Sequence, residues 1–175
     1  PVFLGFECEW LDKYESWYED RLIGEAGAQY LVFGSHWFPR DGELVWAPYL
    51  QGREVFDYID FTISGLKTGL YDFLAHPDLF LARCTHIDSD LLKASADLID
   101  ACIGLNIPIE INGAGTMAEK IVRDGREEYG YPAIAFWEIA RDKNATIICN
   151  SDAHNPQDVL RGARSARSFA ETLGI

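Results

Sequence analysis

Three of the four histidines in this chain follow short apolar runs of the kind that form buried strands. They are His36, His76 and His154. Glu7 lies at the end of another such run, and Asp152 stands two residues before His154. Imidazole nitrogens and carboxylate oxygens are the ligands that Zn, Mn and Fe ions take from proteins. If the runs are parallel strands, these five side chains meet at one rim and can form a metal site.

Each of these residues also has a plainer interpretation when it is taken alone. A single histidine after a strand is more often a hydrogen-bonded loop residue than a ligand, and His86 is interpreted in that way. Asp152 precedes a helix expected to start near Pro156, so it could be a cap or turn residue. A lone Glu7 in an apolar strand is costly to bury without a partner or a metal. The combination of residues at one rim favours the metal site.

Alternating strands and helices must position these side chains. Five apolar runs bounded by turn residues predict buried strands, and the segments between them have the period of amphipathic helices. In the clearest helix, Asp88 or Ser89 can supply the N-cap and Gly104 the stop. The strands are expected at residues 2–6, 30–33, 71–75, 107–111 and 145–149, and the helices at 13–26, 53–68, 88–104, 134–142 and 156–173.

This order of elements predicts an α/β fold. Strict alternation implies parallel strands joined by crossover helices, hence an α/β barrel or a doubly wound sheet. Five βα units are visible, with no linker between domains, and residues 124–132 are expected to form a long loop. A length of 175 residues is typical of one domain. Residues 1–175 are therefore expected to form a single domain.

The charge balance limits the partners of this protein. With 15 Lys and Arg against 28 Asp and Glu, the net charge is −13, which repels a nucleic-acid backbone. No apolar run reaches the roughly 18 to 20 residues that a bilayer span requires, and the first ten residues lack the basic start of a secretory signal. The four cysteines contain no CxxC pair, so a disulfide framework is not expected. We expect a cytoplasmic protein that binds neither nucleic acid nor membrane.

Several aromatic residues flank one of the histidines on a predicted loop. Such residues are usually part of a core, but on a loop beside a candidate ligand they could line a pocket instead. The aromatic residues that flank His36 are Trp37, Phe38, Trp46 and Tyr49.

Five stretches of the chain, taken together, resemble the polymerase and histidinol phosphatase (PHP) superfamily, and in particular its histidinol-phosphate phosphatase branch. They occur in the order of that family, each at the end of a predicted strand, and the resemblance extends to about residue 165. The last stretch is the most specific. The stretches are Leu4-Gly5-Phe6-Glu7, Phe33-Gly34-Ser35-His36-Trp37, Ala75-His76-Pro77-Asp78, Glu110-Ile111-Asn112 and Asn150-Ser151-Asp152-Ala153-His154-Asn155-Pro156.

The resemblance implies a distorted (β/α)7 TIM-like barrel that holds two or three divalent metal ions (Zn, Mn or Fe) at the carboxyl ends of its strands. Five of the seven βα units are present in this sequence. The first two units of the family, which carry a His-x-His pair and a further histidine, have no counterpart. Because the unclosed barrel would expose strand edges and apolar surface, we expect a missing N-terminal segment or an oligomer partner to complete it.

The resemblance also assigns roles to individual residues. Glu7 would bridge two metal ions, and His36 and His76 would complete one of them. Asp152 would bind the ion that the absent His-x-His pair also holds, and His154 would help to hold the third.

The reaction that the resemblance implies is hydrolysis of a small phosphate monoester, such as the histidinol phosphate of histidine biosynthesis. Divalent cations offset the net negative charge and activate water for attack on phosphorus. Arg83 could contact the phosphate in a bidentate manner, or could be a solvated loop residue. Asp152, His154 or a metal-bound water could supply the proton to the leaving alkoxide. Glu110 and Asn112 could orient ligands or contact substrate, and Glu110 could instead be purely structural.

Two other functions fit the same residues. A related phosphoesterase or nuclease would act on another phosphate, and the net charge weighs against the nuclease but not against other small substrates. A non-catalytic domain that keeps the barrel would bind metal weakly or not at all. An assay for released phosphate separates this last possibility from the others.

Overall fold

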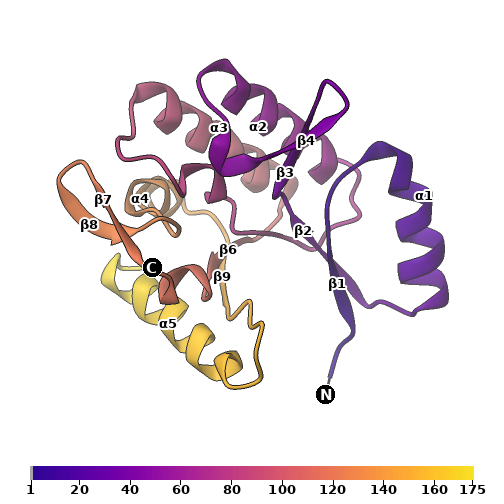
Figure 1. The fold of residues 1–175 in the computed structure, drawn as a ribbon. Helices are drawn as coiled ribbons and strands as arrows, with labels where there is room; N and C mark the ends of the chain where they lie inside the picture. The colour runs from indigo at the N-terminus through magenta and orange to yellow at the C-terminus, as the bar shows by residue number, and fades with distance from the viewer. Residues whose placement is uncertain (1) are drawn as a thin grey trace.

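A five-stranded parallel sheet forms the centre of the computed structural model, which describes residues 2–175 (Figure 1). The strand order is β1-β2-β5-β6-β9, so each strand pairs with the sheet strands next to it in the chain. The five predicted strands and their parallel direction are confirmed, with boundaries shifted by up to three residues. The sheet strands are β1 (Gly5–Cys8), β2 (Tyr30–Gly34), β5 (Phe73–Ala75), β6 (Ile109–Asn112) and β9 (Ile147–Asn150).

Helices connect the strands at the predicted places. Asp88 caps α3, because its side chain accepts hydrogen bonds from the backbone N–H groups of Asp90 and Leu91. Gly104 lies inside this helix, and the left-handed Asn106 (φ 57°) ends it instead. The helices are α1 (Glu15–Trp17), which continues as a π-helix (Tyr18–Glu25), α2 (Arg53–Leu66), α3 (Ser89–Leu105), α4 (Ile134–Asp142) and α5 (Asp158–Thr172), with short 3-10 turns at Asp12–Tyr14, Ala47–Tyr49, Leu79–Leu81 and Gly115–Met117.

The core lies between the sheet and the helices that cover it. α2 packs beside α3 and α3 beside α4, while α5 lies against β6 and β9 (Figure 1). The side chains that fill the space between them are almost completely removed from water, which supplies the main stabilising free energy of the fold. The largest of them are Trp137, Tyr58, Phe33, Phe80 and Phe136.

Two antiparallel hairpins were not predicted from the sequence. One consists of β3 (Trp37–Arg40) and β4 (Glu43–Trp46), and the other of β7 (Lys120–Arg123) and β8 (Arg126–Tyr129). The interpretation of residues 124–132 as a long loop is therefore wrong for the part that β8 occupies. Both hairpins turn at an Asp-Gly pair in which both residues have positive φ (Asp41-Gly42 and Asp124-Gly125), a conformation that favours this dipeptide in two-residue turns.

The sheet is open in residues 2–175. β1 and β9 are its two edges, and no pairing joins them into a closed barrel. Among the same residues, no helix combines the length and the apolar composition needed to cross a lipid bilayer.

Candidate metal centre

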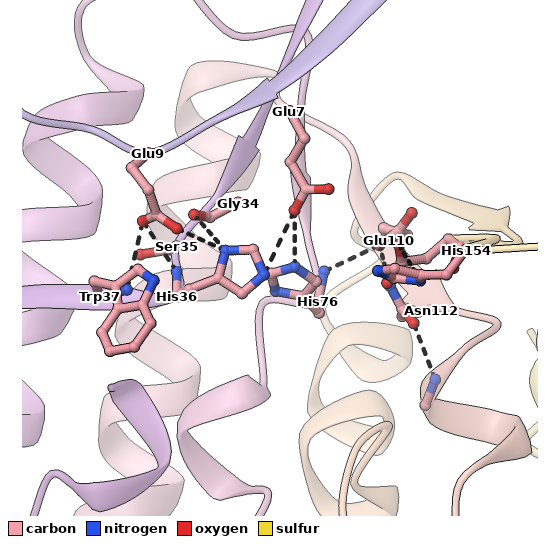
Figure 2. A network of polar contacts seen from close by, with 12 residues as sticks. Glu7, Glu9, Gly34, Ser35, His36, Trp37, His76, Glu110, Asn112 and His154 are labelled. Carbon is pink, nitrogen blue, oxygen red and sulfur yellow. Dashed lines mark hydrogen bonds and ion pairs between the residues drawn. The ribbon is translucent and has the colours of Figure 1, made fainter. Parts of the chain in front are cut away.

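Three of the predicted ligands meet at the carboxyl ends of adjacent strands. Glu7 comes from β1, His36 follows β2 by two residues and His76 follows β5 directly. Glu7 Oε1 lies 3.0 Å from His76 Nε2 and 3.7 Å from His36 Nε2, and one ligand atom from each residue lies within 4.8 Å of the others. Ligands at about 2.1 Å from a Zn ion are at most about 4.2 Å apart. The two distances from Glu7 fit an ion shared with either histidine, and in Figure 2 Glu7 points between the two rings.

The missing side chain of Gly34 makes room for Glu7. A Cβ atom at this position would collide with the carboxylate of Glu7. The two strands run parallel, and Glu7 pairs with Val32, two residues before Gly34. The Glu7 side chain reaches over the end of β2, and this path is open because Gly34 has no side chain.

His76 is held in a buried and conformationally restricted position. It is 3% exposed, and its backbone has a positive φ of 32°, which is uncommon for a residue with a side chain. Its backbone N–H donates to Glu110 Oε2 at 3.1 Å. Among residues 2–175, its Nδ1 is buried without a hydrogen-bond partner, and its one polar side-chain contact is that of Nε2 with Glu7. The ring nitrogen that faces the other members of the group is therefore Nε2.

Histidine contacts set the charge states of this group. Burial raises the pKa of Glu7, but the hydrogen bond with His76 and the positive charges of His76, His36 and His154 outweigh it and leave the pKa below its ordinary value. Burial lowers the pKa of His36, but its hydrogen bond to Glu9 and the charges of both carboxylates outweigh that effect and raise it. Glu7 is therefore an anion at neutral pH, as a ligand carboxylate must be.

A second chain of polar contacts extends from His76 to the end of β9. Asn112 Nδ2 donates to Glu110 Oε2 and to Asp152 Oδ2, each at 3.0 Å, and its Oδ1 accepts from the backbone N–H of Gly115. Burial raises the pKa of Glu110, although the positive charge of His76 and the contact with Asn112 act against it. The expectation that Glu110 and Asn112 orient other residues at the rim agrees with these contacts.

Asp152 and His154 lie outside the three-residue group. Asp152 is tied to Asn112, and its side chain is 23% exposed, with a positive backbone φ of 46°. The side chain of His154 is 80% exposed, and its Nδ1 lies 3.0 Å from the carbonyl oxygen of Asp152. In Figure 2, His154 lies away from the rings of His36 and His76. Of the five predicted ligands, the structure thus brings three into one group.

Arg83 and the aromatic residues that flank His36 are not members of the three-residue group. Arg83 is exposed, and its guanidinium lies over the ring of Tyr49, 5.0 Å from the centroid. Tyr49 in turn packs edge-on against Trp46. Phe38 packs against Tyr58 and Phe61 of α2 and thus belongs to the core side of the β3–β4 hairpin, while Trp37 is partly exposed.

Two carboxylates at the rim were missed in the sequence. Glu9 Oε1 lies 2.6 Å from His36 Nδ1, and its Oε2 accepts from the backbone N–H of His36. Asp78 is fully buried and accepts from the backbone of Ala133 and from Trp137 Nε1, which ties the end of β5 to α4; burial raises its pKa to about 6. The sequence did contain a signal for Glu9. Residues two apart on a strand share a face, so the spacing Glu7-x-Glu9 predicts that Glu9 lies on the same face as Glu7.

One solved structure shares this arrangement of strands and helices. It is a crystal structure of a protein from Listeria monocytogenes, described there as a candidate histidinol phosphatase, hisK. The TM-score is 0.64 and the identity is 16%, over 94% of this chain and 68% of the other. At that identity the likeness shows a common fold. No protein-family profile and no curated protein sequence matches the chain.

Proposed function

We propose that this chain is a PHP-like, metal-dependent phosphatase that hydrolyses a small phosphate monoester of the histidinol phosphate type. The observation that carries the proposal is the convergence of Glu7, His36 and His76 at the carboxyl ends of adjacent parallel strands. This rim is where α/β proteins with parallel strands place their reactive groups. The fold shared with a candidate histidinol phosphatase, together with the motif resemblance, supports the choice of reaction.

In the proposed site, the two Nε2 atoms of His36 and His76 and the carboxylate of Glu7 hold a divalent ion, which we take to be Zn, Mn or Fe. Asp152 and His154 are assigned to further ions and to proton delivery at the leaving alkoxide. Bound divalent ions neutralise phosphoryl oxygens and lower the pKa of water. Arg83, which follows His76 by seven residues, is assigned to the phosphate because a guanidinium can form a bidentate contact with phosphate oxygens.

We also propose that the open sheet is one part of a (β/α)7 TIM-like barrel, formed by residues 1–175 as a single domain and completed by a further βα segment of the same protein or by an oligomer partner. Residues from β2, β5 and β9 line one open hollow of about 640 Å³. The side chains of Val2, Phe3 and Leu4 are exposed beside β1. Covering them would remove apolar surface from water.

Metal content and phosphate release test this function. Elemental analysis of the purified protein, followed by an assay with histidinol phosphate, should find bound Zn, Mn or Fe and released inorganic phosphate. His76→Ala and Glu7→Gln should lose both. His86→Ala is the matched control, because His86 pairs with Asp124 on the surface and should keep both.

The outcomes separate the three functions. Metal binding with hydrolysis of another small phosphate, but not of histidinol phosphate, would favour a different phosphoesterase. Metal binding without any phosphate release would leave a non-catalytic domain. Metal content that is equal in the wild type and in both rim variants would show that the three side chains do not form the site.

A further inference from the structure

The side chain of Glu9 contacts one imidazole and the backbone that carries it. Its Oε1 lies 2.6 Å from Nδ1 of His36, and its Oε2 accepts from the backbone N–H groups of His36 at 3.2 Å and of Trp37 at 3.4 Å (Figure 2). Both carboxylate oxygens are therefore used in hydrogen bonds, and Glu9 is not one of the three residues that could surround an ion.

The position of Glu9 is itself fixed from the other side. Its carbonyl oxygen accepts hydrogen bonds from the hydroxyl groups of Tyr18 at 2.5 Å and of Tyr71 at 3.4 Å. Tyr18 and Tyr71 are both buried, so the backbone of Glu9 is tied to the core directly after β1. The carboxylate is thus held in place before any ligand arrives.

The partners of Nδ1 determine which nitrogen of His36 carries the proton. Besides Glu9, the carbonyl oxygen of Gly34 lies 3.1 Å from this nitrogen. A carboxylate and a carbonyl only accept hydrogen bonds, so the Nδ1 atom between them must be the donor. In the neutral ring the lone pair is then on Nε2, the nitrogen that faces Glu7.

We propose that Glu9 is a positioning residue that holds His36 as the Nδ1–H tautomer and so presents the lone pair of Nε2 to a divalent ion beside Glu7. The inference rests on the metal site proposed above. His76 offers an internal contrast, because among residues 2–175 its Nδ1 has no hydrogen-bond partner and its ring is held by burial and by the contact of Nε2 with Glu7. Carboxylate partners of this kind typically alter metal affinity about 10- to 100-fold.

The test replaces one acceptor by a donor. In Glu9→Gln, the single amide oxygen must serve the backbone N–H groups of His36 and Trp37, which are donors only. The amide NH2 then faces Nδ1 as a donor, so only the longer contact with the Gly34 carbonyl still favours a proton on Nδ1. Long-range ¹H–¹⁵N NMR of the metal-free protein at pH 8.5 or so should report Nδ1–H in the wild type and an increased share of the Nε2–H tautomer in the variant, with the signals of His36 assigned from His36→Ala.

Affinity for Mn²⁺, measured by calorimetry, is the second readout. Glu9→Gln should bind Mn²⁺ about 10- to 100-fold more weakly than the wild type. Glu43→Gln, the same change of charge at an exposed position of β4, should bind as the wild type does. In the His36→Ala background, Glu9→Gln should cause no further loss, because the residue acts through His36.

Three results would each contradict one statement: the tautomer of His36, the effect of Glu9 on metal affinity, or the metal site itself. Nε2–H in the wild type would overturn the inference without any variant, so it stays testable even if Glu9→Gln fails to fold. Wild-type affinity in a folded Glu9→Gln would overturn it while leaving the metal site intact. A wild type that binds no Mn²⁺, Zn²⁺ or Fe²⁺ would instead remove the proposed function on which the inference rests.

Discussion

The two sets of predicted ligands differ in how they are held. Glu7, His36 and His76 come from adjacent strands and contact one another, whereas Asp152 and His154 follow β9 at an edge of the sheet. His76, one residue beyond its strand, is 3% exposed, while the side chain of His154, four residues beyond its strand, is 80% exposed. His154, the residue farthest from its strand, is thus also the most exposed of the five.

This difference indicates that the first three residues are arranged in advance and that His154 is not. A preformed group loses little conformational freedom when it binds an ion, whereas an exposed side chain must be ordered at that moment. The tightest site should therefore depend on Glu7, His36 and His76. Four measurements can sharpen or break this comparison.

The largest effect is expected for the central carboxylate. Glu7→Gln should weaken the tightest Mn²⁺ site by more than about 100-fold, because it removes a charged ligand rather than a partner of a ligand. Asp152→Asn, the same change at the other set, should weaken that site by less than about 10-fold. Calorimetric titration of both variants checks this, and equal losses would contradict the comparison.

Asn112 connects the two sets, and its loss should be the largest effect on stability. Asn112→Ala removes the donor shared by Glu110 and Asp152 and leaves the N–H of Gly115 without its acceptor, so we expect about 2–3 kcal/mol of destabilisation. Urea denaturation of the metal-free protein measures it. Asn155→Ala, at an exposed position whose side chain contacts only Asp158, is the control and should change little.

A pair of histidine variants compares the sets directly. In the metal-free protein, His76→Ala should cost about 1–2 kcal/mol because it opens a cavity at a buried position. His154→Ala should stay within about 0.5 kcal/mol, as is usual for an exposed side chain. The same urea experiment measures both, and a larger loss for His154→Ala would show that its loop is held more firmly than its exposure indicates.

The smallest effect concerns a histidine–carboxylate pair outside the site. A hydrogen bond with Asp124 and the charge of that residue raise the pKa of His86. The contribution of the pair is therefore complete below the unfolded pKa of about 6.5 and is lost as the pH rises through the higher folded value. His86→Ala should lower the melting temperature by about 1 °C at pH 6 and not at pH 9. An equal change at both pH values would mean that packing, and not charge, is responsible.

Much of the fold could be predicted from the sequence, because each sheet strand is a short apolar run bounded by turn residues. Residues 30–33 and 107–111 are of this kind. The β7–β8 hairpin was missed because charged residues dominate its strands, and the β3–β4 hairpin because its aromatic residues were interpreted as part of a loop beside His36. The Asp41-Gly42 and Asp124-Gly125 turns were the stronger signal in both cases.

The candidate site was predictable only where a side chain lies close to a strand end. Glu7, His36 and His76 met the expectation, since parallel strands bring their ends together. Glu9 also follows a strand directly, but its role could not be assigned from the sequence, because it depends on how the side chain turns back to His36. The closed barrel stays a prediction, since the described sheet has two open edges.

The order of strands in the sheet also bears on how the protein folds. Every sheet strand pairs with the sheet strands next to it in the chain, so the described sheet forms without any pairing between β1 and β9. Parallel sheets usually fold slowly, since distant segments must meet before their contacts stabilise anything. Here the longest loop closed by any pairing is that of a single βα unit with its hairpin, so the chain can assemble one unit at a time, starting from any pair of neighbouring strands.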